Sequence, residues 1–229
     1  MTKAPPPLEE QAETFADEMN SVLVATVTDD VAMVSAKVDL DRTVFVVGNA
    51  VELGTHDLKS IGTLRGQRFP VSGLDGVSLS ATWVFIPSTN GNWLKSWSSS
   101  FGLYVGKTPF VRLEVDPNKP EGSWLQAHIH VTAESRLLGY LRGLQRQDRD
   151  RLEQLHLPVG GFLFRPGIED FIEFAIDEER IPGKEGWKEA LRATSEHFLR
   201  RQFMAMVGRR PNWAREGLAD VERRSQEEE

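Results

Sequence analysis

Two histidines, His128 and His130, flank a single isoleucine and are the residues of this sequence best suited to chemistry. An imidazole can exchange a proton near neutral pH or bind a transition metal, so the pair offers two kinds of reaction. Ala127, Ile129 and Val131 alternate with the histidines, and this period of two predicts a strand whose apolar side faces a core. We therefore expect both imidazoles on the opposite, exposed face, with Cα atoms about 7 Å apart.

The segment before the histidines, TPFVRLEV, alternates in the same way. Val111, Leu113 and Val115 would point to the core, which leaves Arg112 and Glu114 on the polar side. If the two segments form a regular hairpin, the arginine and the glutamate become cross-strand neighbours of the histidines. The sequence thus predicts a polar face that carries two imidazoles, a cation and a carboxylate. A polar outer face is also an ordinary feature of antiparallel sheets, so a purely structural role fits as well.

Acid–base catalysis on a phosphodiester is the first functional interpretation of this face. His128 and His130 would serve as general base and general acid, and Arg112 and Arg165 would bind the anionic substrate. Such a site needs no cofactor. On this interpretation the protein is of a toxin or defence type and acts, like a ribonuclease, on RNA or another phosphodiester.

A metal site is the second interpretation. The spacing Gly122-x5-His128-x-His130-x3-Glu134 resembles the first motif of the cupins. That resemblance implies a jelly-roll barrel in which the two histidines and the glutamate, with His156 as a later histidine, bind a divalent metal. The chain contains no cysteine, so any metal must be held by nitrogen and oxygen atoms, and imidazole and carboxylate ligands suit that chemistry. The cupin glycine six positions after the glutamate is absent here.

Binding of a partner without catalysis is the third interpretation. Trp124 and Phe110 would lie on the same face as the histidines and provide apolar anchors beside polar groups. Residues 188–224 carry nine basic and five acidic side chains, although the whole chain has a net charge of −7. These basic C-terminal helices are a candidate surface for RNA or for a protein partner, whereas the acidic whole is poorly suited to nonspecific nucleic-acid binding.

Residues 155–178, LHLPVGGFLFRPGIEDFIEFAIDE, resemble part of an uncharacterised, actinobacterial-type family of hypothetical proteins. The family pattern is LHLPVGG, an RFRP segment in whose place this chain has FLFRP, an acidic, hydrophobic EDF helix and an arginine-rich helix, and the resemblance extends over roughly residues 108–210. It implies no known activity. A histidine-rich strand followed by a helix is also similar to toxins of the TumE type, which is why toxin or defence biology is our first functional expectation.

The elements that must hold these residues change in character along the chain. An acidic amphipathic helix is predicted at residues 8–20, strands rich in Val, Thr and aromatic residues follow from 21 to 132, and helices follow after 133. Short turns between the strands favour an antiparallel meander, so the fold class is α+β with helices on one face. We expect the following divisions: a disordered tail at 1–7, the N-terminal helix and sheet at 8–132, a helical layer of the same domain at 133–222, and a frayed tail at 223–229.

The absence of several sequence motifs argues against common classes of enzyme. There is no Walker loop, no dinucleotide-binding glycine pattern, no serine-hydrolase elbow and no HExxH helix, so the common NTPase, dehydrogenase, serine hydrolase and zincin classes are poor matches. The sequence contains neither a secretory signal nor an apolar run long enough to cross a membrane. We therefore expect a cytoplasmic protein without a membrane partner; its oligomeric state is left open.

Overall fold

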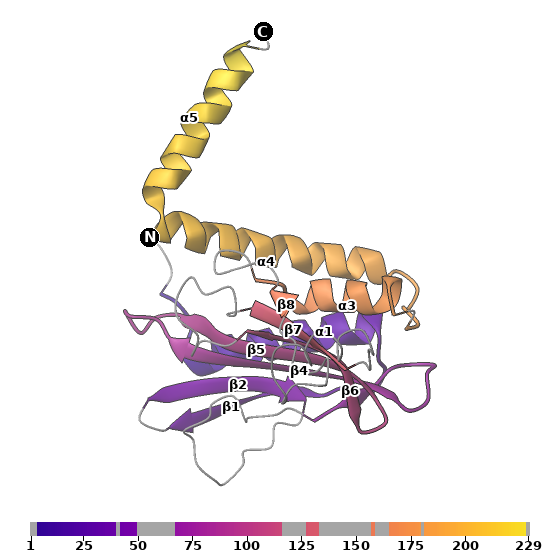
Figure 1. The fold of residues 1–229 in the computed structure, drawn as a ribbon. Helices are drawn as coiled ribbons and strands as arrows, with labels where there is room; N and C mark the ends of the chain where they lie inside the picture. The colour runs from indigo at the N-terminus through magenta and orange to yellow at the C-terminus, as the bar shows by residue number, and fades with distance from the viewer. Residues whose placement is uncertain are drawn as a thin grey trace, which may run out of the picture.

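A computed structural model describes residues 4–39, 42–49, 67–115, 127–132, 157–158, 165–179 and 181–227. Within these residues the chain forms helices and strands in an α+β arrangement, as the sequence predicts (Figure 1). The elements are α1 (Leu8–Thr26), β1 (Met33–Asp39), β2 (Thr43–Asn49), β3 (Phe69–Pro70), β4 (Val77–Pro87), β5 (Leu94–Val105), β6 (Thr108–Val115), β7 (Ala127–Val131), β8 (Leu157–Pro158), α3 (Ile168–Asp177), α4 (Trp187–Arg209) and α5 (Pro211–Glu227).

The strands form one sheet in the order β1-β2-β4-β5-β6-β7-β8, with β3 beside β4. Every pairing is antiparallel, which confirms the predicted meander. Tight turns make this order possible. Gly106, between β5 and β6, has φ of 57°, a left-handed conformation that glycine adopts without steric cost.

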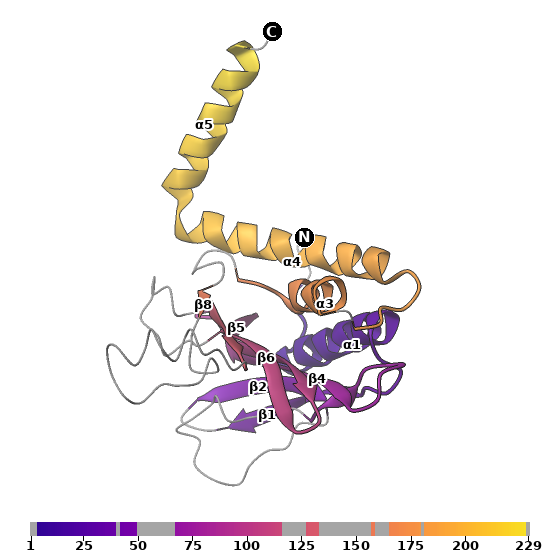
Figure 2. The same cartoon turned by 45° about the vertical axis from the view of Figure 1, so that its right-hand side comes forward.

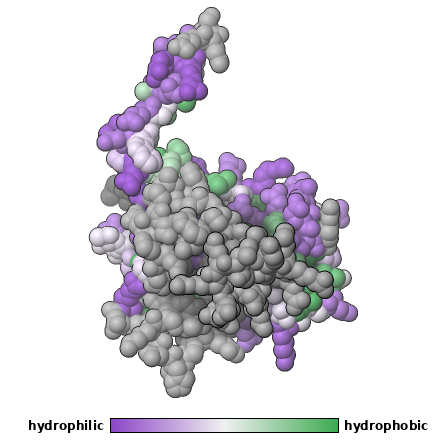
Figure 3. Space-filling model, in the orientation of Figure 1, coloured by the Kyte–Doolittle hydropathy of each residue, from purple (hydrophilic) through white to green (hydrophobic). Residues whose placement is uncertain are grey.

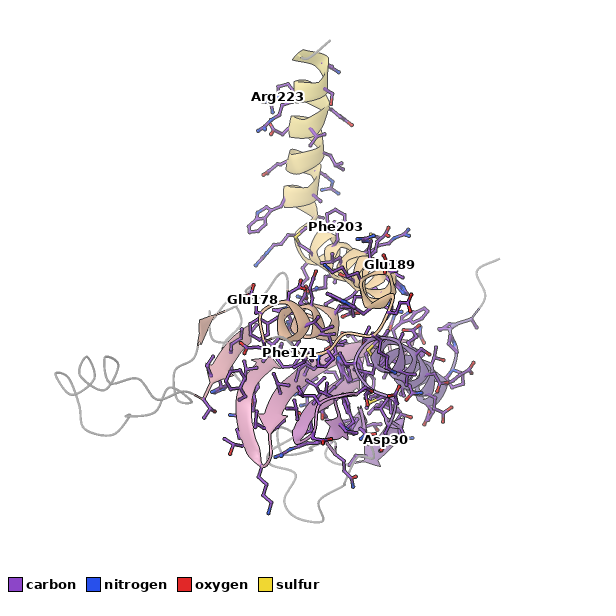
Figure 4. All side chains as sticks on the ribbon, turned by 90° about the vertical axis from the view of Figure 1, so that its right-hand side faces the viewer. Asp30, Phe171, Glu178, Glu189, Phe203 and Arg223 are labelled. Carbon is purple, nitrogen blue, oxygen red and sulfur yellow. The ribbon has the colours of Figure 1, made fainter. Side chains whose placement is uncertain are left out.

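The helices α1 and α3 cover one face of the sheet, and α4 crosses above them (Figures 1 and 2). Their apolar residues recur at helical spacing and face the sheet, where Phe101 of β5 lies with its ring centroid 5.2 Å from that of Trp83 and 6.1 Å from that of Phe171. Figure 4 shows Phe171 pointing from α3 toward the strands. Burial of these aromatic side chains joins the helical layer to the sheet.

The helix α1 is longer than the sequence predicts. It continues to Thr26, whereas β structure is expected from residue 21. Val22 and Leu23 are 5% and 0% exposed, because they extend the apolar stripe of α1 over the sheet. Packing therefore outweighs the strand preference of the β-branched residues in this segment.

Two C-terminal segments also differ from expectation. Leu157–Pro158 pairs with β7 as a short strand, so the region predicted as a helical layer also contributes to the sheet. The helix α5 continues to Glu227 and so includes most of the residues predicted to fray. Residues 133–156, where the predicted helical layer begins, lie outside the described residues.

The helix α5 projects away from the rest of the chain (Figures 1, 2 and 4). None of its described side chains is buried, and Figure 3 shows a mostly hydrophilic surface along it. Trp213, Leu218 and Val221 are exposed apolar exceptions. Across the described residues, no helix has the length and apolar character needed to cross a bilayer.

Candidate functional site

The histidine pair lies on β7, which pairs with β6 as the sequence predicts. His130 is opposite Arg112, and His128 is opposite Glu114. Leu113, on the other side of β6, belongs to the core between sheet and helices. Because side chains alternate along a strand, both imidazoles project from the face of the sheet that α1 and α3 do not cover. The structure thus brings together the four polar residues that the sequence placed on one face.

Both imidazoles converge on one carboxylate oxygen. Glu114 Oε2 is 3.4 Å from Nε2 of His130 and 3.8 Å from Nε2 of His128. The two rings meet edge to face, with centroids 4.8 Å apart. One potential metal-ligating atom from each of the three residues lies within 4.8 Å of the others. We call these residues, Glu114, His128 and His130, the Glu-His-His cluster.

The second oxygen of this carboxylate is held by an arginine. Arg112 Nη1 is 3.1 Å from Glu114 Oε1, so Oε2 is left to the imidazoles. A hydrogen bond from His130 lowers the pKa of the Glu114 carboxyl below its ordinary value, and the charge of Arg112 lowers it further, while burial opposes the shift. The carboxylate is therefore ionised at neutral pH and offers its lone pairs to a cation or a proton.

Burial of the pair is the main departure from the predicted site. His128 is only 3% exposed, and the His130 side chain is 11% exposed. The prediction of an exposed face is therefore wrong at these two positions. Alternation fixes the side of the sheet on which a residue lies, but it does not fix what covers that side.

The other predicted site residues do not join the cluster. Arg165 lines a cavity on the helical side of the sheet, which it shares with the core residues Trp83 and Phe101. It is therefore separated from the imidazoles by the sheet itself. Glu134 and His156, the further metal ligands implied by the cupin resemblance, lie outside the described residues. The described strands form a single sheet with helices on one face, which differs from a jelly-roll barrel.

The apolar anchor predicted beside the histidines is also placed differently. The pairing of β5 with β6 shifts between Leu103 and Tyr104, and this bulge leaves Phe110 as the additional residue of β6. Phe110 packs against the main core. It therefore lies away from the polar face, and Trp124 falls outside the described residues.

Sequence reasoning placed Glu114 beside the histidines but did not assign it as a ligand. The motif that suggested a metal site pointed along the chain to Glu134 instead. The signal for Glu114 was the cross-strand register, because residues directly opposite on neighbouring strands lie closer than residues four to six apart along one strand. The cavity around Arg165 had no such signal in the sequence.

The comparisons with known proteins give no relative from which a function could be transferred: the chain matches no protein-family model, no curated protein and no solved structure.

Proposed function

We propose that this protein binds a divalent transition-metal ion through the Glu-His-His cluster and is a metal-dependent enzyme. The observation that carries the proposal is the convergence of two imidazole nitrogens and one carboxylate oxygen within 4.8 Å. Two histidines and one carboxylate are a ligand set that catalytic zinc and non-haem iron sites use. A metal bound there would supply a Lewis acid that polarises a substrate or activates water.

Charge balance supports a cation at this position. Glu114 is ionised and its side chain is 28% exposed, while the imidazoles beside it are nearly buried. A transition metal binds a negative carboxylate, the form that Glu114 holds at neutral pH, together with neutral imidazole, so metal binding would displace any proton from the ligating nitrogens. Arg112 binds the carboxylate oxygen that faces away from the imidazoles, and so orients Oε2 toward them.

Metal-free cleavage of a phosphodiester is less well served by the same geometry. The acid and the base of an in-line displacement act on oxygens at opposite sides of phosphorus, so the two nitrogens must point at two different oxygens rather than at one. Here a ligand atom of each imidazole lies within 4.8 Å of the other, and both approach one carboxylate oxygen. A phosphodiester remains the substrate class that we propose for the metal-bound enzyme.

Cobalt titration of the full-length protein, purified without a histidine tag and stripped with a chelator, tests the proposal. Co²⁺ bound to protein ligands absorbs visible light, so affinity and stoichiometry are both measured. We expect one ion per chain, and an affinity at least tenfold weaker in each of His128→Ala, His130→Ala and Glu114→Gln. His197→Ala, an exposed histidine of α4, is the matched control and should bind as the parent does.

Activity is measured on the same samples with a single-stranded RNA and with bis(p-nitrophenyl) phosphate. The metal proposal predicts cleavage that a chelator abolishes and that added metal restores. Sub-stoichiometric cobalt binding, or binding unchanged by all three cluster variants, would show that the proposal is wrong. Cleavage that persists with chelator but is lost in the histidine variants would instead support metal-free acid–base catalysis.

A further inference from the structure

A second feature of the molecule lies on the opposite side of the sheet from the Glu-His-His cluster. A cavity of about 530 Å³ opens between α1, the strands β4 and β5, and α4. Its floor is aromatic and comes from Phe15, Trp83, Phe85 and Phe101. The rings form one packed group, since Phe15 meets Trp83 and Phe85 edge to face with centroids 5.2 and 5.0 Å away. The volume is within the range of small-molecule sites, which runs from about 300 to 1,000 Å³.

Cationic side chains line the same cavity. Four cations line it: Arg165 from the segment before α3, Arg201 and Arg209 from α4, and Lys95 from β5. The acidic residues of the lining are Glu18 and Glu169. No ion pair joins any of the four cations to a carboxylate among the residues that the structure describes. Within the described part of the chain, the cavity thus combines an aromatic floor with four cations that form no ion pair.

Arg165 is the cation most firmly fixed in this lining. Its backbone N–H donates to Gln202 Oε1 at 2.6 Å, and its carbonyl oxygen accepts from Gln202 Nε2 at 3.0 Å. These two hydrogen bonds to Gln202 of α4 fix the backbone of Arg165, from which the guanidinium extends. Burial lowers the pKa of Arg165, and the like charge of Arg209 lowers it further. Two guanidiniums that repel each other in a partly dry cavity would be stabilised by an anion between them.

We infer that this cavity binds an amphipathic organic acid, whose apolar body lies on the aromatic floor and whose single anionic head group is held by Arg165 and Arg209. The aromatic residues supply the apolar contact area, and the guanidiniums supply charge-assisted hydrogen bonds to a carboxylate, phosphate or sulfonate. This site requires no residue of the Glu-His-His cluster. The inference about the cavity can therefore be tested separately from the proposed metal site.

Two fluorescent probes with the same ring skeleton test the inference on the full-length protein. The anionic probe is 8-anilinonaphthalene-1-sulfonate, and the neutral probe is N-phenyl-1-naphthylamine, which lacks the sulfonate. We expect the anionic probe to bind at least fivefold more tightly, and decanoate to displace it at least fivefold more effectively than decanol. Equal binding of the two probes would overturn the assignment of an anion site.

Variants locate the binding. Arg165→Met with Arg209→Met should weaken the anionic probe at least fivefold and change the neutral probe less than twofold. Arg215→Met with Arg224→Met removes the same charge from α5, outside the cavity, and should change neither probe. Ala205→Trp, on the α4 wall of the cavity, should weaken both probes at least fivefold because the indole occupies the space.

Circular dichroism and thermal unfolding of each variant separate loss of binding from loss of structure. If the double arginine variant does not fold, Arg209→Met alone replaces it, since Arg209 is exposed at the end of α4. A folded arginine variant that binds the anionic probe within fivefold of the parent would overturn the inference, and so would full binding to Ala205→Trp. His128→Ala, which removes a proposed metal ligand, should bind both probes as the parent does. That result would show that the cavity binds its ligand whether or not the Glu-His-His cluster binds a metal.

Discussion

The ammonium group of Lys184 donates a hydrogen bond to the carbonyl oxygen of Thr28 at 2.9 Å and so connects residues 156 positions apart in the chain. It also donates to the carbonyl oxygen of Val24 at 2.8 Å and forms an ion pair with Asp29. These partners lie at and just beyond the C-terminal end of α1, where helical carbonyl groups lack partners within the helix. One lysine thus satisfies the end of α1 and fixes the loop that leads into α4.

Lys184→Met is expected to lower the free energy of unfolding by about 1–3 kcal/mol, because it leaves the part-buried carbonyl oxygen of Thr28 and the exposed one of Val24 without this donor. Urea unfolding followed by circular dichroism measures the change. Lys107→Met, at the exposed turn between β5 and β6, should change stability by less than about 0.5 kcal/mol. Equal stabilities of the two variants would mean that Lys184 is not a structural link.

Gly167→Ala is expected to lower stability by about 1–3 kcal/mol. A Cβ at this position would lie 2.5 Å from Oε2 of Glu169 and 2.9 Å from Cε1 of Phe198, so the start of α3 and α4 would have to separate. Gly208→Ala in α4 meets no atom within 4 Å and should instead raise helix stability, by up to about 1 kcal/mol. Thermal unfolding should therefore show shifts of opposite sign for the two alanines.

Glu114→Asp is expected to weaken metal binding at least tenfold although it keeps the negative charge. The shorter side chain withdraws the carboxylate by about 1.5 Å from the imidazoles, and a metal ligand must lie within a few tenths of an ångström of its place. Cobalt titration measures the loss, with Glu173→Asp on the exposed side of α3 as the control. An unchanged affinity would show that charge alone, rather than the position of Oε2, attracts the ion.

Glu169→Gln is expected to increase stability progressively above about pH 4.5, the ordinary pKa of glutamate. Burial raises the pKa of Glu169 in the folded protein, so the folded state retains this proton to a higher pH than the unfolded state does. Protonated Glu169 therefore contributes to the free energy of unfolding of the parent protein. This contribution is complete below pH 4.5 and is lost as the pH rises through the raised pKa of Glu169. Urea unfolding between pH 4 and 8 should show the gap between variant and parent widening with pH.

Deletion of α5 after Arg210 is expected to leave the unfolding temperature within about 2 °C of the parent value, because none of the described side chains of α5 is buried. Cobalt and probe binding should also be unchanged. Differential scanning calorimetry measures the transition. A large destabilisation would mean that Trp213, Leu218 and Val221 pack against something that the isolated chain does not show.

Much of the fold could be predicted because its signals are local. The alternation in TPFVRLEV and AHIHV specified strands and their core faces, and the turn residues between them specified antiparallel neighbours. The end of α1 could not be predicted this way. Residues 21–26 have the composition of a strand, and only the sheet beneath them makes the helix the better way to bury Val22 and Leu23.

The candidate site was likewise predictable only in part from the sequence. The sequence by itself determined that His128, His130, Arg112 and Glu114 share one face, because the period of a strand is a property of its own backbone. Tertiary structure alone decided that the imidazoles are nearly buried and close around one oxygen of Glu114, and that Arg165 lies across the sheet in a cavity that Arg209 also lines. Those relations depend on how far strands and helices from distant parts of the chain approach one another, and such distances are set by packing rather than by any local pattern.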